Sequence, residues 1–371
     1  MLKAKRMLLP ELLIVFAKTM QPAVPAADKE EAFMKFGHFD DARREYVITT
    51  PQTPLPWINY LGSEDFFSLV SNTAGGYSFY RDARLRRLTR YRYNSSPLDM
   101  DGHHIYIKDG GTVWNPGWQP TKTPLDRYSC RHGLGYTILE GEKDGICAAQ
   151  ELFVPKGDAC ELDRLTLTNR SDRPRELDVF SYVEFCLWDA VDDSTNFQRN
   201  FSTGEVEVEP CAIYHKTEYR ERRDHYAVFW SNTPVTSFDT ARDAFCGVYG
   251  GPADPQAVRA GHCSGSIAHG WAPVGALHIH VTLAPGEKKK ILFGLGYIEN
   301  PQEEKFTAPG VINKTRAHAM MARYADDAQV DAARAALADH WESLLSGYRL
   351  QSGEEKLDRM VNIWHQYQCM V

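Results

Sequence analysis

From residue 34 to about residue 298 the chain is a succession of short β-branched and aromatic runs separated by Gly, Pro, Asn and Asp. ELDRLTLTNRSDRPRELDVFSYVEF, residues 161–185, alternates apolar and polar residues on either side of a turn-forming stretch, and LHIHVTLAPGEKKKILFGLGYIE, residues 277–299, does the same around APGE. We expect each to form a hairpin with one buried face. Strands without intervening helices favour antiparallel sheets packed face to face.

After Asn300 the pattern changes to a helical one. We predict one helix within 311–325, a second within 328–348 and a third from near Glu354 that is still running at Val371. The second helix carries an apolar stripe of Leu337, Trp341, Leu344 and Leu345, and the third carries one of Leu357, Met360, Val361 and Trp364. We expect Leu344, Leu345, Met360 and Trp364 to be exposed, because no later domain is present to cover them.

The formal net charge of −7 argues against nucleic acid as a partner. The eight cysteines contain no C-x-x-C pair, so neither a zinc site nor a disulfide framework is indicated. Cys160 and Cys186 fall in apolar runs, where a free thiol acts as a small hydrophobe, and this usage favours a cytoplasmic location.

Residues 1–33 differ from the rest, because basic residues precede the run MLLPELLIVFAKTM. We predict a leader outside the globular fold, and a secretory signal is the alternative. Pro10 and Glu11 interrupt the apolar run, and no segment reaches the roughly 20 apolar residues that a membrane-spanning helix requires. We therefore expect no membrane association.

Several long runs are specific enough to compare with a family. They are GHFDDARREYVITTPQTPLPWINYLGSEDFFSLVSNTAGGYSFYRDARLRRLTRYRYN, FSYVEFCLWDAVDDSTNFQRNFSTGEVEVE, IYHKTEYRERRDHYAVF and EKLDRMVNIWHQYQCMV. They resemble the amino-terminal region of cellobiose phosphorylases and related glycoside phosphorylases of glycoside hydrolase family 94. The resemblance extends from about Met34 to the last residue.

The resemblance implies a mainly β chain: a galactose-mutarotase-like antiparallel β-supersandwich at 34–305, an α-helical linker at 306–350, and the start of an (α/α)6 catalytic barrel at 351–371. The full enzyme would be a homodimer that converts cellobiose and inorganic phosphate to α-glucose 1-phosphate and glucose with inversion, without a cofactor or metal. The catalytic Asp would lie beyond residue 371, so we expect this chain alone to be inactive. A stand-alone carbohydrate-binding β-sandwich module is the alternative.

The arginine-rich segment at 75–92, GGYSFYRDARLRRLTRYR, is the candidate binding feature. In the resembled family this loop approaches the acceptor side of the catalytic pocket. The resemblance makes Tyr80, Arg81 and Leu85 candidates for shaping the acceptor sugar subsite, in the same subunit or in a partner. The alternative is that the arginines form ion pairs with nearby carboxylates while the tyrosines pack beneath them.

Four other residues are weighed for chemistry. Asp192 and Asp193 are adjacent carboxylates that could raise each other's pKa, but neighbours on a strand point to opposite faces, so a turn or capping role is favoured. His103 and His104 are expected to be exposed turn residues. The second basic cluster, residues 218–224, mixes both charge signs and is expected to form an ion-pair network.

Overall fold

The computed structural model describes residues 35–62, 64–94, 96–195, 204–219, 221–222, 224–270 and 272–371. The leader expected at residues 1–33 lies outside this part of the chain. The side chains of residues 218–223, which make up most of the second basic cluster, lie outside it as well.

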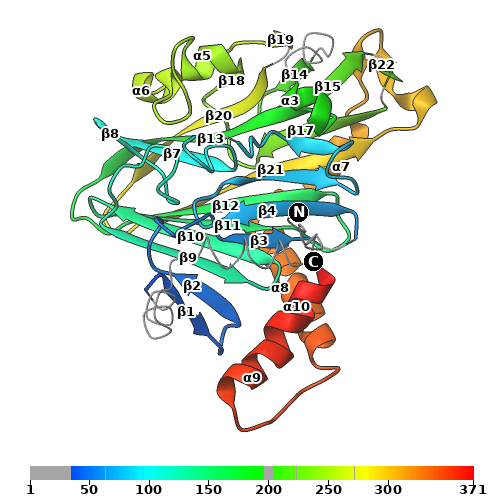
Figure 1. Ribbon diagram of the computed structural model, residues 1–371. Helices are drawn as coiled ribbons and strands as arrows, with labels where there is room; N and C mark the ends of the chain where they lie inside the picture. Colours follow the sequence, from blue (N-terminus) through cyan, green and yellow to red (C-terminus); the bar gives the residue numbers. More distant parts are fainter. Residues whose placement is uncertain are drawn as a thin grey trace, which may run out of the picture.

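The described chain is built on two large antiparallel sheets, which confirms the mainly β prediction (Figure 1). The 12-stranded sheet contains, in spatial order, β1 (Gly37–Asp40), β2 (Glu45–Ile48), β9 (Arg127–Gly133), β10 (Tyr136–Lys143), β11 (Ile146–Phe153), β12 (Cys160–Asn169), β21 (Lys288–Glu299), β17 (His225–Ser231), β15 (Ala212–Tyr219), β14 (Gly204–Glu209) and β19 (His269–Gly270), with β16 (Glu221–Arg222) beside β15. The nine-stranded sheet contains β18 (Ser237–Ala241), β20 (Pro273–Leu283), β13 (Arg175–Trp188), β6 (Arg87–Thr89), β5 (Gly76–Tyr80), β4 (Phe66–Ser71) and β3 (Ile58–Leu61), with β7 (His104–Asp109) on β13 and β8 (Thr112–Trp114) on β7.

The helices are short except for one. They are α3 (Ala190–Ser194), α5 (Arg242–Cys246), α6 (Gln256–Ala260), α7 (Thr315–Ala322), α8 (Asp327–Leu345), α9 (Glu355–Arg359) and α10 (His365–Met370), with a 3-10 turn at Gln302–Glu304 and a π-helical turn at Met360–Trp364 between α9 and α10. A two-stranded ribbon of β22 (Phe306–Ala308) and β23 (Val311–Ile312) precedes α7. The three helices predicted after Asn300 are confirmed in position.

The main core lies between the two sheets. It contains inward-facing residues of both, such as Leu165 of β12 and Phe185 of β13, both fully buried. Cys160 and Cys186 are also buried, as expected for thiols that act as small hydrophobes. Burial of this kind over two complete sheet faces is the main source of the stability of such a domain.

The two predicted hairpins are wrong, although the strands themselves are correct. β12 pairs with β11 and β21, whereas β13 pairs with β20, β6 and β7, so the chain crosses from one sheet to the other at residues 170–174. The second crossing, at residues 284–287, separates β20 from β21. The Asn169 side-chain amide donates to the backbone oxygens of Arg173, Leu283 and Ala284, which ties the two crossings together. Both are corners of a sandwich.

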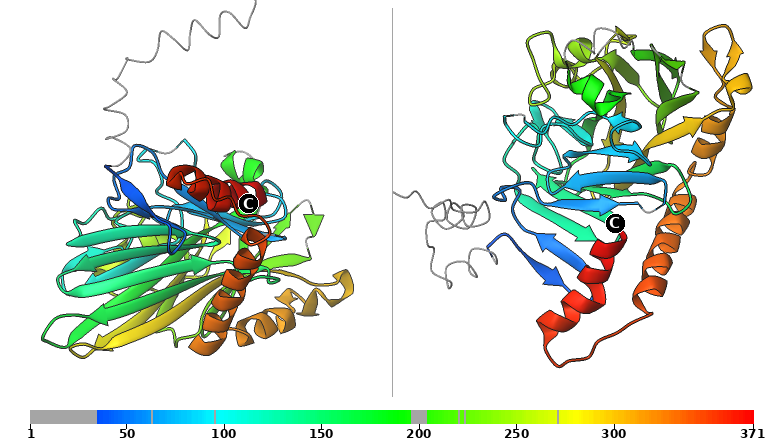
Figure 2. Two further views of the ribbon diagram at one scale, coloured as in Figure 1. Left: turned by 90° about the horizontal axis from the view of Figure 1, so that it is seen from below. Right: turned by 45° about the vertical axis from the view of Figure 1, so that its right-hand side comes forward.

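Helices α7 and α8 cover part of the outer face of the 12-stranded sheet. Figure 2 shows α8 running past this sheet and α10 returning towards β3. Leu337, Trp341 and Leu345 of α8 are buried there together with Ile363 and Tyr367. The approach is close at the β9–β10 turn, because a Cβ at Gly135 would meet the indole nitrogen of Trp341 at 2.7 Å.

The expected exposure of the helices is therefore wrong for Leu345, which is 3% exposed against the sandwich. Met360 and Trp364 are partly buried, and Leu344 alone of the four matches the expectation at 37% exposed. On the third helix Ile363 and Tyr367 take the buried positions that were assigned to the predicted stripe. The π-helical turn widens the helix there, so spacing based on 3.6 residues per turn misassigns its face.

These packing contacts predict a difference between two leucines of α8. We expect Leu337→Ala to lower the free energy of unfolding by about 2–5 kcal/mol, because it leaves a cavity in the core. Leu344→Ala is the matched control and should cost less than about 1 kcal/mol. Urea unfolding of both variants measures the difference, and equal losses would contradict the assignment of the buried face.

Candidate functional site

The three predicted subsite residues lie at the end of β5 and in the loop to β6. The ring of Tyr80 stacks on Tyr297 of β21, with centroids 4.0 Å apart and planes 8° from parallel. Arg81 has a left-handed backbone (φ 58°) and a two-point ion pair with Asp65, at 2.7 and 3.0 Å. Leu85 is half exposed. The loop thus directs Tyr80 towards the other sheet and Leu85 towards solvent, and the subsite role of all three residues stays a prediction.

Asp82 gives the loop its shape. Its carboxylate accepts the backbone N–H groups of Arg84 and Leu85, both at 2.8 Å. The N–H of Leu85 contributes most to holding the pKa of Asp82 below its usual value, followed by that of Arg84. An Asp that accepts N–H groups two and three residues later is a common way to close a tight turn. The turn holds the backbone between Asp82 and Arg86, whose N–H donates to the backbone oxygen of Asp82 at 3.0 Å.

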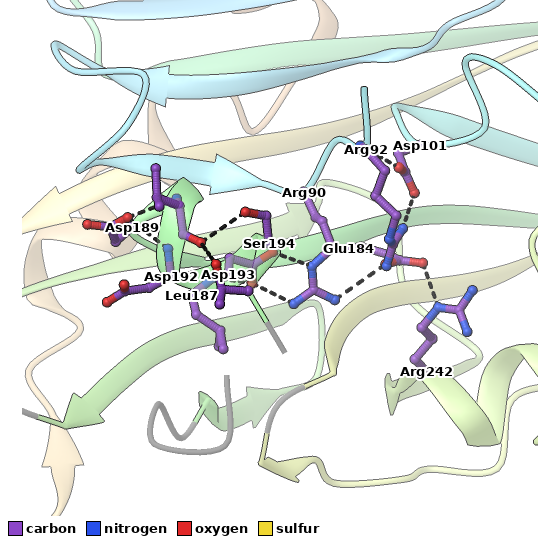
Figure 3. A network of polar contacts seen from close by, with 12 residues as sticks. Arg90, Arg92, Asp101, Glu184, Leu187, Asp189, Asp192, Asp193, Ser194 and Arg242 are labelled. Atoms are coloured by element: carbon purple, nitrogen blue, oxygen red, sulfur yellow. Dashed lines mark hydrogen bonds and ion pairs between the residues drawn. The ribbon is translucent and has the colours of Figure 1, made fainter. Parts of the chain in front are cut away.

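The second half of the segment enters a buried ion-pair network, shown in Figure 3. The Arg90 guanidinium donates to both carboxylate oxygens of Asp193 at 2.6 Å, and both side chains are nearly completely buried. Burial opposes the charged form of Arg90, but Asp193 and Glu184 outweigh it and raise the pKa of the guanidinium. The ion-pair alternative therefore describes this half of the segment.

Asp192 and Asp193 lie on helix α3, not on a strand as assumed. Asp189 caps this helix by accepting the N–H groups of Val191 and Asp192. Asp193 accepts the backbone N–H of Leu187 in addition to the Arg90 guanidinium. Both oxygens of Asp193 are therefore occupied by donors inside the protein, and neither is free to contact a substrate. The capping role predicted for this stretch falls to Asp189.

Glu184 of β13 is the centre of the network and was not singled out from the sequence. Its carboxylate accepts from Arg242 at 2.8 Å and from Arg92 at 2.9 Å, and Arg90 lies at 3.5 Å. Burial raises the pKa of Glu184, but the three guanidinium groups outweigh burial and hold it well below its usual range. A signal was present: a lone Glu in the apolar run FSYVEFCLW must find partners if the strand is buried.

Two open cavities flank this network on the outer side of the nine-stranded sheet. One, of about 910 Å³, lies between residues 92–101 and residues 241–272. The other, of about 720 Å³, lies between residues 83–94 and α3. Arg92 lines both, and it is ion-paired with Asp101 as well as with Glu184. Both volumes fall within the range of about 300–1,000 Å³ that is usual for small-molecule sites.

His103 and His104 are buried, so the prediction of exposed turn residues is wrong. His104 begins β7, and its Nε2 donates to the backbone oxygen of Met100 at 2.9 Å. His103 lies between the sheets with its Nε2 2.9 Å from Glu161, whose other oxygen accepts from Ser78 at 2.7 Å. Both histidines are buried because β7 joins the nine-stranded sheet by pairing with β13. That strand lies some 70 residues later in the chain, so the local sequence does not reveal the pairing.

The His103 cluster contains two carboxylates with opposite behaviour. Burial disfavours the imidazolium of His103, but Glu161 outweighs it, so the pKa of His103 is raised and that of Glu161 is lowered. Asp163 accepts from Gln150 at 2.8 Å and lacks a cationic partner at ion-pair distance among the described residues. Burial raises its pKa to about 7. The cluster is a structural feature of the core and does not reach either cavity.

Two further observations limit the chemistry of the described residues. Within the described ranges, no group of three or more His, Cys, Asp or Glu side chains is placed to hold a metal ion. Of the helices in the part of the chain that the structure describes, none has the length and apolar content needed to cross a membrane.

Comparison with known proteins decides the family. Residues 44–327 match the model of the glycosyl hydrolase 94 supersandwich domain. The chain belongs to this family. The N,N'-diacetylchitobiose phosphorylase of Vibrio furnissii is 37% identical over 343 residues, which cover 91% of this chain. The solabiose phosphorylase of Paenibacillus borealis is 36% identical over 256 residues, which cover 68% of it.

The supersandwich accounts for only part of these relatives. The chain spans 41% of the length of the Vibrio furnissii protein and 33% of that of the Paenibacillus borealis protein. A solved structure named as a kojibiose phosphorylase from the human microbiome shares the fold over 90% of this chain and 42% of its own, with a TM-score of 0.51 at 9% identity. These findings confirm the β-supersandwich and the resemblance to the phosphorylases of this family.

The buried network predicts a large effect at Arg90. We expect Arg90→Met to lower the free energy of unfolding by about 3–5 kcal/mol, because the buried Asp193 carboxylate loses the guanidinium that pairs with it. Arg81→Met removes an exposed ion pair and should cost less than about 1 kcal/mol. Urea unfolding at pH 7.5 compares the two, and a similar loss in both would show that the network does not stabilise the sandwich.

The raised pKa of Asp163 predicts a pH dependence of stability. The folded state keeps its proton up to about pH 7, whereas an unfolded Asp loses it near pH 3.9. Stability should therefore fall as pH rises through this window, by at most about 1.4 kcal/mol per unit from this group. Asp163→Asn should flatten the fall between pH 4 and 7, and exposed Asp172→Asn should not. Thermal unfolding measured between pH 4 and 7 tests this prediction. If stability falls with pH equally in the wild type and in Asp163→Asn, the raised pKa of Asp163 is contradicted.

Proposed function

We propose that this chain is the amino-terminal supersandwich of an inverting disaccharide phosphorylase. The observation that carries the proposal is the family match over residues 44–327, together with relatives above 35% identity that are named as phosphorylases. The proposed reaction joins inorganic phosphate to the anomeric carbon of a β-linked disaccharide and releases the second sugar. Cellobiose is the substrate proposed from the sequence, with α-glucose 1-phosphate and glucose as products and with phosphate as co-substrate.

N,N'-Diacetylchitobiose is the second candidate substrate. Its support is the 37% identity to the Vibrio furnissii protein that bears this substrate in its name. The two disaccharides share the β-linked pyranose backbone and differ in the 2-substituent, which is hydroxyl in one and acetamido in the other. A direct comparison of both as substrates separates the candidates.

The proposed chemistry needs one carboxylic acid to protonate the leaving oxygen while phosphate attacks from the opposite face. Phosphate is ionised at neutral pH, so a base that activates water is not required. Asp193 does not fit the acid role, because it is buried and both of its oxygens accept from Arg90. We propose that the acid belongs to the part of the relatives' length that this chain does not span, and that these 371 residues alone do not turn over.

The proposed contribution of this chain is to support assembly and to shape the acceptor subsite through Tyr80, Arg81 and Leu85. Exposure of Leu85 and of the Arg81–Asp65 pair makes this loop accessible to a second domain or to the partner of a homodimer.

We keep the proposed division into a supersandwich at 34–305, a helical linker at 306–350 and the first barrel helix from 351. The buried free thiols favour the cytoplasm as the proposed location. A carbohydrate-binding module without chemistry is the alternative.

The first test is phosphorolysis by the full-length protein and by the 371-residue chain. We expect the full-length protein alone to release α-glucose 1-phosphate from cellobiose and phosphate. Leu85→Ala should raise the KM for glucose in the reverse direction by about 5–10-fold, as expected for loss of one contact at the acceptor subsite.

Two controls make this test specific. Leu357→Ala removes a similarly exposed leucine on α9 and should leave the KM for glucose unchanged. N,N'-Diacetylchitobiose is assayed in parallel. Turnover by the short chain would place the acid among its own residues, and failure of the full-length protein on both disaccharides would overturn the proposed function.

A further inference from the structure

The cavity of about 720 Å³ beside α3 is lined by more positive than negative charge. Its lining includes Arg84, Arg87, Arg90 and Arg92, but Asp193 is the one carboxylate among the described lining residues. Arg90 is neutralised by Asp193, and Arg92 pairs with Asp101 and Glu184 (Figure 3). Arg84 and Arg87 account for the excess positive charge.

Arg87 is a buried cation without an anion at ion-pair distance within the described ranges. The residue is 8% exposed, and its Nε donates to the backbone oxygen of Ala83 at 2.8 Å. Its guanidinium lies over the ring of Tyr77 at 4.0 Å and faces that of Tyr93 at 5.8 Å. A buried charge that lacks a counter-charge is costly, so its remaining N–H groups are suited to an anion that enters from the cavity.

Arg84 adds a second cation at the rim of the same cavity. Arg84 lies three residues before Arg87, in the loop that Asp82 closes. Its exposed side chain has no ion-pair partner within 4.0 Å among the described residues. Asp82 influences Arg84 from a greater distance, since the charge on Arg84 helps to lower the pKa of Asp82. Two guanidinium groups on one wall can each present paired N–H donors to phosphate or carboxylate oxygens.

The opposite requirement, an apolar surface for a ring, is met by two tyrosines of the same cavity. Tyr93 is 58% exposed and meets Tyr91 edge to face, with ring centroids 5.1 Å apart. Ser194 of α3 adds a hydroxyl on the other wall. Aromatic faces with a few fixed polar groups are the usual lining of a small-molecule site, and an exposed tyrosine face suits the C–H surface of a pyranose.

We propose that this cavity binds a sugar that carries an anionic oxygen group, a phosphate ester or a carboxylate, with the anion on Arg84 and Arg87 and the sugar ring on Tyr93. This site differs from the proposed acceptor subsite, because Tyr80 turns towards Tyr297 between the sheets whereas the cavity opens on the outer side of the nine-stranded sheet. Binding here does not require turnover, so it is measured independently of the proposed reaction.

The test is isothermal titration calorimetry of the 371-residue chain at low salt with α-glucose 1-phosphate, glucuronate and glucose. We expect one or both anionic sugars to bind at least about tenfold more tightly than glucose, as charge-assisted hydrogen bonds imply. Tighter binding of α-glucose 1-phosphate identifies the phosphate ester as the preferred group, and tighter binding of glucuronate identifies the carboxylate.

Two variants and one control locate the site. Arg87→Met and Arg84→Met should each weaken binding of the anionic sugar by about tenfold or more. Arg84 lies in an exposed loop, so its variant tests the site even where loss of Arg87 disturbs folding. Arg173→Met removes an exposed arginine from a distant sandwich corner and should bind like the wild type. The proposal is overturned if neither anionic sugar binds, if glucose binds equally well, or if Arg84→Met binds unchanged.

Discussion

Burial of the Glu184 carboxylate is the constraint on which the outer side of the nine-stranded sheet depends. A carboxylate in this position is stable only if cations replace the water that it loses. The three guanidinium groups come from the segment after β6 and from α5, so both must pack against β13 at once. The network therefore adds side-chain links to the backbone pairing of β6 with β13 and brings α5 to the same carboxylate. Members of the network line both cavities, and Arg92 lines each of them.

The strands could be predicted from the sequence, but their partners could not. Alternation of apolar and polar residues shows that one face of a strand is buried, and this is equally true of a hairpin and of a strand that crosses to the opposite sheet. The run from Cys160 to Trp188 has this property on both sides of its turn, yet β12 and β13 lie in different sheets. The two strands find partners in β21 and β20, and the amide of Asn169 contacts Leu283 and Ala284, more than 110 residues away. Local pattern carries no information about such a distant partner.

In the candidate site, too, the segment could be predicted from the sequence but its partners could not. The arginine-rich segment was recognisable by composition, and its role in ion pairs was foreseen as an alternative. Its partners were not, because Asp193 and Glu184 follow about 100 residues later and come together with Arg90 only through the antiparallel pairing of β6 with β13. His103 and His104 were misplaced for a related reason, since two polar residues directly after Asp101 and Gly102 resemble a turn. Their burial is decided by β7 pairing with β13.

The outer side of the nine-stranded sheet is covered over only part of its area. The β13–β20 half lies beneath α5 and α6. On the β4–β5 half, Phe67 and Phe79 stack at 5.3 Å, and Tyr77 continues this row. Rings that pack on each other expose less apolar surface than isolated rings. The last ring of the row still has one face without a neighbouring ring, and a group that tolerates water must cover it.

Arg87 supplies that end, because its planar guanidinium covers the ring of Tyr77 while its charge faces the cavity. Lysine has the charge but lacks the plane, so it would cover the ring less well and would present a single point charge instead of paired donors. The same group thus meets a requirement of folding, which is to close an apolar row, and creates the electrostatic condition for an anionic ligand. A guanidinium that packs on this ring therefore also brings a positive charge to the cavity, and an anion bound there would offset the cost of burying that charge.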